Sequence, residues 1–77
     1  MISEHEQAKR WRLSHGWELQ ELAHLTGYSR SMLYWYERGV TPRGTPIEGY
    51  AWQRFRRVCA AVEADPEGVK FKWGNET

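Results

Sequence analysis

The chain has 77 residues, of which 40% are hydrophobic and 27% are charged, and its net charge is +1. These proportions are typical of one soluble globular domain. They exclude a membrane-spanning helix, because no apolar run approaches ~18 residues. The N-terminus lacks the apolar stretch of a secretory signal, and the single cysteine cannot form an intrachain disulfide. We therefore expect a single domain over residues 1–77, located in the cytoplasm.

The first predicted helix covers residues 3–14. Ser3 is a suitable N-cap, and Glu6 three residues later completes a capping box. Ala8 and Trp11 fall on one face of this helix, which marks the side that turns inward.

Residues 18–39 predict two helices joined by a tight turn, which is the layout of a helix-turn-helix. We expect helices over residues 18–25 and 29–38, with Gly27 providing the left-handed turn and Ser29 capping the second helix. Four residues are spaced to share a core: Leu22, Ala23, Leu33 and Tyr36. The other side of the second helix carries Ser29, Arg30, Ser31, Tyr34 and Trp35. A helix-turn-helix presents this side to the DNA major groove.

Positive charge is concentrated in one part of the chain. Residues 30–57 contain six arginines and two glutamates, a net charge of +4, whereas the remainder carries a net charge of −3. A local basic region attracts a polyanion even when the whole chain is nearly neutral. Three of these residues, Arg54, Arg56 and Arg57, lie on a predicted helix, where the alternatives are phosphate contacts and a solvated face.

Two prolines and a glycine predict a loop over residues 40–47, and a long helix follows over residues 48–64. The inward face of this helix is predicted from apolar residues at helical spacing: Ala51, Phe55, Val58 and Val62. The tail over residues 68–74 changes period, because its apolar residues alternate with lysines. This alternation predicts a half-buried β-strand.

A lone strand leaves its backbone groups unpaired, and a chain of this length buries only ~60% of its unfolded surface. Both problems are solved if the strand pairs with its copy in a dimer, so we predict a dimer interface made by Val69, Phe71 and Trp73. The alternative is an extended tail that packs Phe71 and Trp73 on its own helices. The predicted fold is mainly α, a bundle of about four helices with a helix-turn-helix and a short C-terminal strand.

The segment LAHLTGYSRSMLYWYERG resembles the core of the Cro/C1-type (xenobiotic-response-element) helix-turn-helix repressors. The resemblance covers roughly residues 8–40. It depends on Leu22-Ala23, Gly27, Ser29-Arg30-Ser31, Leu33 and Glu37-Arg38-Gly39, with Trp11-Arg12 and Gly16-Trp17 upstream. It implies five short helices, the third of which lies in the major groove.

The resemblance also implies roles for individual residues. Base edges would be met by Ser29, Arg30, Ser31 and Trp35, with Met32 and Tyr34 beside them. Phosphates would be met by Arg38 and Arg43. Arg12 and Glu37 match a partly buried ion pair of the family that ties the first helix to the end of the reading helix.

Other roles stay open for several of these residues. Arg30 can donate two hydrogen bonds to guanine from the start of the helix, but it can also contact phosphate or solvent. Ser29 can act on DNA or only cap its own helix. For Tyr34 and Trp35 the alternatives are contacts with thymine or deoxyribose and packing on the fourth helix. The predicted base-contacting set is Ser29, Arg30, Ser31, Tyr34 and Trp35.

Several positions depart from the family. Leu19 stands where a phosphate-contacting glutamine is common, and Glu18 replaces the usual Ser or Thr cap with a carboxylate that repels phosphate. Tyr34 and Trp35 are bulkier than the usual residues of this helix. The second half of the chain differs as a whole, so the family's dimer interface is not carried over.

The residue pattern does not indicate an enzyme. The three histidines and Cys59 lack the spacing of metal ligands, and the chain has no nucleophile elbow or phosphate-binding glycine loop. We therefore expect no catalytic residue, no metal and no cofactor.

These patterns favour a dimeric repressor that binds double-stranded DNA at an inverted-repeat operator. Analogy with the family suggests a phage or another mobile element as the source. One alternative is an antitoxin-like or other protein-interaction module with an unknown protein partner. Another is an architectural or excision factor that bends DNA.

Overall fold

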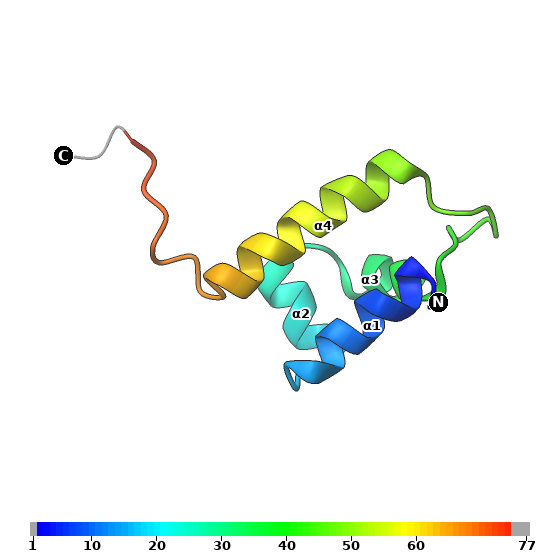
Figure 1. Cartoon of the computed structure of the whole chain (residues 1–77), viewed down its shortest axis with the longest axis horizontal. Coiled ribbons are helices and arrows are strands. Elements are labelled where there is room, and N and C mark those ends of the chain that lie inside the picture. Colours follow the sequence, from blue (N-terminus) through cyan, green and yellow to red (C-terminus); the bar gives the residue numbers. More distant parts are fainter. Residues whose placement is uncertain (1, 75–77) are drawn as a thin grey trace.

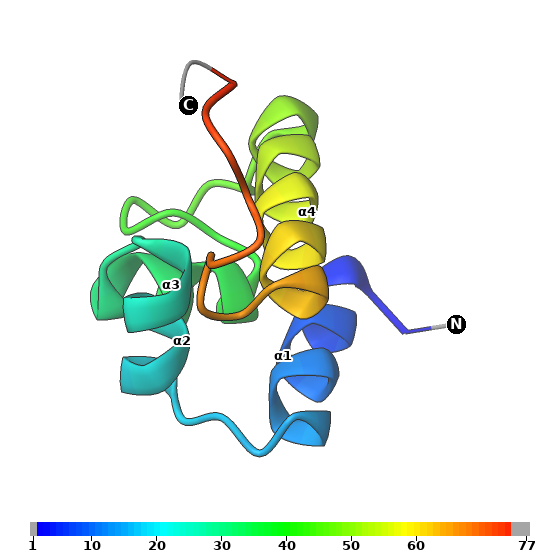
Figure 2. The same ribbon diagram turned by 90° about the vertical axis from the view of Figure 1, so that its left-hand side faces the viewer.

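The computed structural model describes residues 2–74 and contains four helices in this part of the chain. They are α1 (Glu4–Ser14), α2 (Leu19–Thr26), α3 (Arg30–Arg38) and α4 (Gly49–Ala64). The long helix α4 lies across the three shorter ones, and the tail leaves the bundle beyond its C-terminal end (Figure 1). Seen from that end, α1 and α4 lie on one side of the bundle and α2 and α3 on the other (Figure 2).

The helix boundaries follow the predicted capping residues. Ser3 and Ser29 are N-caps, and their hydroxyls accept hydrogen bonds from the backbone N–H groups of Glu6 (3.4 Å) and Met32 (3.0 Å). Gly27 ends α2 with φ of 82°, a conformation that a side chain disfavours. The turn between α2 and α3 is therefore set by residues within it.

The core is small and its centre is the helix-turn-helix. Leu22 of α2 and Leu33 of α3 are almost completely buried, and Ala23 is buried beside them. The small Ala23 side chain leaves room for the two helices to approach. Trp52 and Phe55 of α4 complete this core, so α4 packs on the helix-turn-helix through two large aromatic rings.

The inward face of α4 differs from the predicted one by about one residue. Phe55 and Val62 are buried as expected, but Ala51 and Val58 are only half-buried, and Trp52 is buried instead. The reason is the ring of Tyr36, which stacks on Phe55 with centroids 4.5 Å apart and meets the edge of Trp52 at 5.2 Å. Burying aromatic rings removes more apolar area than burying Ala51.

The predicted C-terminal strand is wrong: residues 68–74 form no strand in the structure. Within residues 2–74 the β-type pairing consists of one bridge between Val40 and Pro46, so the tail has no strand to pair with. Val69, Phe71 and Trp73 are exposed at 67%, 62% and 76%. The alternative, a tail packed on its own helices, is therefore not observed either.

Candidate nucleic-acid interface

The helix α3 is anchored by one face and exposes the other. Leu33 faces the core at 0% exposure, whereas Arg30, Ser31 and Tyr34 are exposed and Trp35 is half-buried. The predicted reading residues therefore lie together on one outward surface. This surface carries hydrogen-bond donors and aromatic rings, which are the groups that recognise base edges and sugars.

Ser29 lies at the start of this surface as a helix cap. Its Oγ accepts the Met32 N–H at 3.0 Å, which satisfies one of the free donors of the first turn. The hydroxyl hydrogen is still available to an outside acceptor, because the cap uses only the oxygen lone pair. Ser29 thus has the capping role that the sequence left open, and this role does not prevent its hydroxyl from also donating a hydrogen bond to DNA.

Tyr34, Trp35 and Arg38 form a cluster at the C-terminal half of α3. The guanidinium carbon of Arg38 lies 5.5 Å from the Tyr34 ring centroid and 5.9 Å from that of Trp35. The two rings meet edge to face at 5.1 Å. The ring of α3 that packs on the α4 rings is Tyr36 instead. The cation is held close to the reading surface by both rings.

Arg43 lies in a narrow loop that projects from the end of α3 (Figure 1). The loop is closed by the backbone bond from Thr41 N–H to Thr45 C=O at 2.8 Å and by a 2.7 Å bond between the two threonine hydroxyls. Gly44 adopts φ of 84° at the tip. Arg43 is exposed beside it, so its charge is presented on a preformed turn.

Arg12 and Glu37 form the ion pair that the resemblance implied. Arg12 Nε and Nη2 donate to the two carboxylate oxygens of Glu37 at 2.7 and 3.0 Å, and Nη1 donates to the Trp17 carbonyl at 2.8 Å. Both side chains are 9% exposed. The hydrogen bond to Glu37 raises the pKa of Arg12 above its usual value. The pair holds α1, the start of α2 and the end of α3 in one arrangement.

The start of α2 is acidic, as the sequence indicated. The backbone N–H of Glu18 donates to the Glu21 carboxylate at 3.0 Å, so two carboxylates lie where a phosphate would otherwise meet the helix N-terminus. Leu19 packs against the core and is half-buried. This end of α2 is a poor phosphate site.

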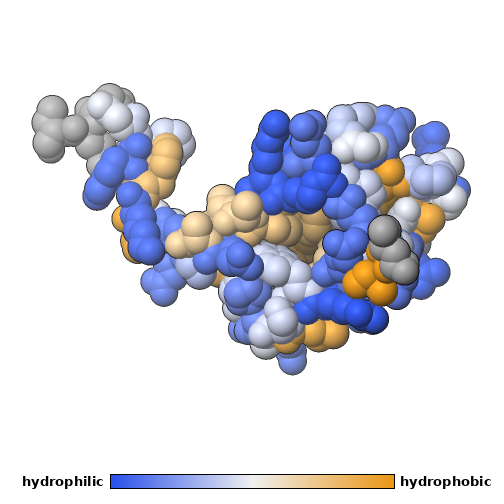
Figure 3. All heavy atoms as spheres, in the orientation of Figure 1, coloured by the Kyte–Doolittle hydropathy of each residue, from blue (hydrophilic) through white to orange (hydrophobic). Residues whose placement is uncertain are grey.

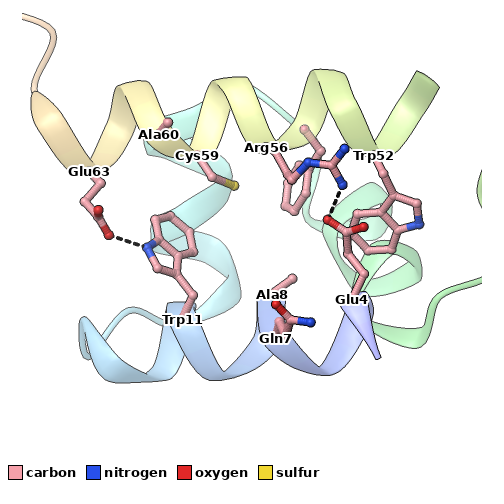
Figure 4. A pocket seen from close by; sticks show the side chains of 10 residues that line it. Glu4, Gln7, Ala8, Trp11, Trp52, Arg56, Cys59, Ala60 and Glu63 are labelled. Carbon is pink, nitrogen blue, oxygen red and sulfur yellow. Dashed lines mark hydrogen bonds and ion pairs between the residues drawn. The ribbon is translucent and has the colours of Figure 1, made fainter. Parts of the chain in front are cut away.

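The long-range contacts of α1 with α4 were missed by sequence reasoning. Trp11 Nε1 donates to Glu63 at 2.6 Å, and Arg56 pairs with Glu4 (Figure 4). Each pair is separated by 52 residues, so no local pattern could have revealed it. Arg56 is thereby directed toward α1 and away from the reading surface.

Cys59 faces the hollow between α1 and α4 (Figure 4). Burial raises the pKa of its thiol to about 12. At neutral pH the thiol therefore stays protonated and is a poor nucleophile. Within residues 2–74, no three His, Cys, Asp or Glu side chains gather as ligands for a metal ion.

The helix-turn-helix domain family matches the chain over residues 6–70, which includes α2, α3, α4 and all but the first two residues of α1. The chain therefore belongs to this family of XRE/Cro-like helix-turn-helix regulators. No curated protein and no solved structure matches the chain significantly.

Two further findings concern the class of protein. The family is typically non-enzymatic, and its helix-turn-helix indicates a DNA-binding regulator. None of the helices described here is long and apolar enough to cross a membrane.

Proposed function

We propose that the chain is a dimeric, sequence-specific repressor, with residues 1–77 acting as one DNA-binding domain. The observation that carries this proposal is the outward face of α3. Arg30, Ser31 and Tyr34 are exposed on it, whereas Leu33 of the same helix is buried in the core. A helix fixed by one face and polar on the other is the form in which a helix-turn-helix reads the major groove.

Within this proposal the residues on and next to α3 divide into two groups. Arg30 reads a guanine through its planar guanidinium, with Ser29, Ser31, Tyr34 and Trp35 as its neighbours on the bases and sugars. Arg38 and Arg43 contact phosphates. The rings around Arg38 support this role, because they restrict its side chain and reduce the entropy lost on binding.

The dimeric form follows from the small size of the domain and from the geometry of DNA. One reading helix contacts only a few base pairs, so two copies on an inverted repeat multiply both affinity and specificity. Two-fold symmetry places the reading helices about one DNA turn apart, roughly 10 bp between half-site centres. Covering a promoter in this way blocks transcription without any further domain.

A gel-shift experiment with DNA from upstream of the chain's own gene tests the proposal. It is run with a scrambled competitor at two salt concentrations, because binding through several phosphates weakens steeply as salt rises. Saturable binding that survives the competitor and protects a two-fold symmetric site is expected. Binding that the scrambled competitor abolishes would indicate an architectural DNA-bending factor, and no binding even at low salt would contradict DNA recognition altogether.

A further inference from the structure

The chain that follows α4 begins with a hydrogen-bonded turn and continues as an exposed segment. The Asp65 carboxylate accepts the backbone N–H groups of Val69 and Lys70 at 3.1 and 2.9 Å, and Gly68 N–H donates to the Asp65 carbonyl at 3.0 Å. Gly68 adopts φ of 67° in this turn. The turn directs the following residues away from the bundle (Figure 1). We call residues 69–74 the arm, and its direction is set before any partner binds.

The arm presents apolar side chains to solvent. Val69, Phe71 and Trp73 are all well exposed, and the two rings contact each other edge to face at 5.0 Å. Hydrophobic and hydrophilic residues alternate along the arm (Figure 3). Contiguous exposed apolar surface on a small soluble domain marks an interaction site.

A groove of about 760 Å³ lies at the root of the arm, between the C-terminal ends of α2 and α4. We call it the root groove. Its apolar lining is formed by Leu25, Val58, Ala61 and Val62. Its polar lining is formed by His24, by Asp65, whose carboxylate is hydrogen-bonded within the turn, and by the exposed Glu67. The groove therefore has the chemistry that suits a segment of alternating apolar and basic residues.

We infer that the root groove of one copy of the chain receives the arm of a second copy. Phe71 and Trp73 enter the apolar lining, and Lys72 lies against Glu67 in the polar lining. The arm begins at the edge of the groove, so a two-fold axis near this edge lets each arm cover the other copy's groove at the same time. This inference concerns how the proposed dimer forms. The role of that dimer in DNA binding rests on the proposed function.

The area available is sufficient for a dimer. An aromatic side chain can bury ~150–250 Å², so the exposed fractions of Phe71 and Trp73 leave roughly 300 Å² of ring surface outside the fold on each arm. Two arms and the groove surface that they cover would then bury roughly 1,200 Å², the lower end of stable interfaces. Val69 and the arm backbone add to this area.

Two other apolar hollows suit the arm less well. The hollow between α1 and α4 is spanned by the Trp11–Glu63 and Arg56–Glu4 contacts (Figure 4), which an entering arm would have to break. The hollow that Trp35 lines lies beside α3 and belongs to the proposed DNA face. The root groove is not spanned by these side-chain contacts, and it does not belong to the proposed DNA face.

Analytical ultracentrifugation of the full chain without DNA tests the inference. Replacing both Phe71 and Trp73 with Ala should raise the dimer dissociation constant at least ~100-fold, because each removes a large buried anchor from both halves of the interface. Ala61→Arg should have a similar effect, because the larger side chain would fill the groove. Ala61 is at an exposed position of α4. Tyr50→Ala is the matched control, since Tyr50 is an exposed ring at the other end of α4, and it should leave the dimer unchanged.

Every outcome decides the inference. A wild-type chain that stays monomeric, or a dimer that survives loss of both rings, overturns it. Loss of the dimer in the arm variant alone, with Ala61→Arg still dimeric, shows that the arm docks elsewhere. Lys72→Glu should weaken the dimer, and adding Glu67→Lys should restore it, a rescue that misfolding cannot produce. The ultracentrifugation is done without DNA, so it measures the dimer alone. A failure to bind DNA would contradict the proposed function but would not change the result for the dimer.

Discussion

The ion pair between Arg12 and Glu37 provides the sharpest test of how the reading helix is held. Arg12→Ala removes three hydrogen bonds, two to Glu37 and one to the Trp17 carbonyl. It leaves the Glu37 carboxylate charged at a site where its side chain is 9% exposed. Breaking one side of a buried pair costs ~3–5 kcal/mol.

That cost is large for a domain of this size. At ~0.05–0.15 kcal/mol per residue, a chain of this length has a total stability of about 4–12 kcal/mol. A loss of ~3 kcal/mol corresponds to a fall in Tm of roughly 12–24 °C for a domain of this size. We therefore expect Arg12→Ala to be partly unfolded near 37 °C, and its DNA binding to fall for that reason.

Urea denaturation followed by circular dichroism measures the effect, with Arg10→Ala as the matched control. Arg10 is an exposed residue on the same helix, so its loss should change stability by less than ~0.5 kcal/mol. The double variant Arg12→Met with Glu37→Leu should be more stable than Arg12→Ala, because it leaves no unpaired buried charge. If Arg12→Ala and Arg10→Ala unfold at the same urea concentration, the pair does not hold α1 to α3.

Further predictions concern the DNA contacts and two titratable groups. Arg30→Ala should reduce the free energy of binding to the cognate site by ~1–3 kcal/mol and relax the preference at one base pair. Arg43→Ala should weaken binding to all DNA sequences equally and reduce the slope of the salt dependence by ~1. Anisotropy titrations in which Arg30→Ala loses equal affinity for cognate and scrambled DNA would refute its base-reading role. The hydrogen bonds with Trp11 and His15 lower the pKa of Glu63 below its usual value. Their stabilising effect is therefore present above the unfolded-state pKa and is lost as pH falls through the lower, folded-state pKa. The stability difference between wild type and Glu63→Gln should therefore shrink on acidification, and a difference that grows would contradict this. The half-buried Cys59 thiol should react with a disulfide reagent more slowly in the folded chain than in urea, and equal rates would show that the fold does not protect it.

Most of the fold was predictable because its signals are local. Ser3, Gly27 and Ser29 mark helix ends through hydrogen bonds and backbone angles within a few residues of themselves. The pattern around Leu22 and Leu33 predicts their burial because only one face of each helix can turn inward. The candidate reading surface was predictable for the same reason, since it is the other face of the helix that carries Leu33.

Two features of the fold, besides the contacts of α1 with α4, were not predictable from local patterns. The choice of Trp52 over Ala51 on α4 depends on the position of Tyr36, which a helical pattern does not contain. The tail alternates like a strand, but strand formation needs a partner strand, and no segment of residues 2–74 pairs with the tail.

The amino-acid sequence by itself determined the four helices, the turn between α2 and α3 and the residues that share the outward face of α3. These depend on periodicity and capping, which act over one or two helical turns. Only the tertiary structure decided which further groups meet across the bundle: Arg12 with the Trp17 carbonyl, Trp11 with Glu63, and an arm left outside the core. Contacts between distant residues depend on how the helices pack, because packing brings together groups that no local pattern relates.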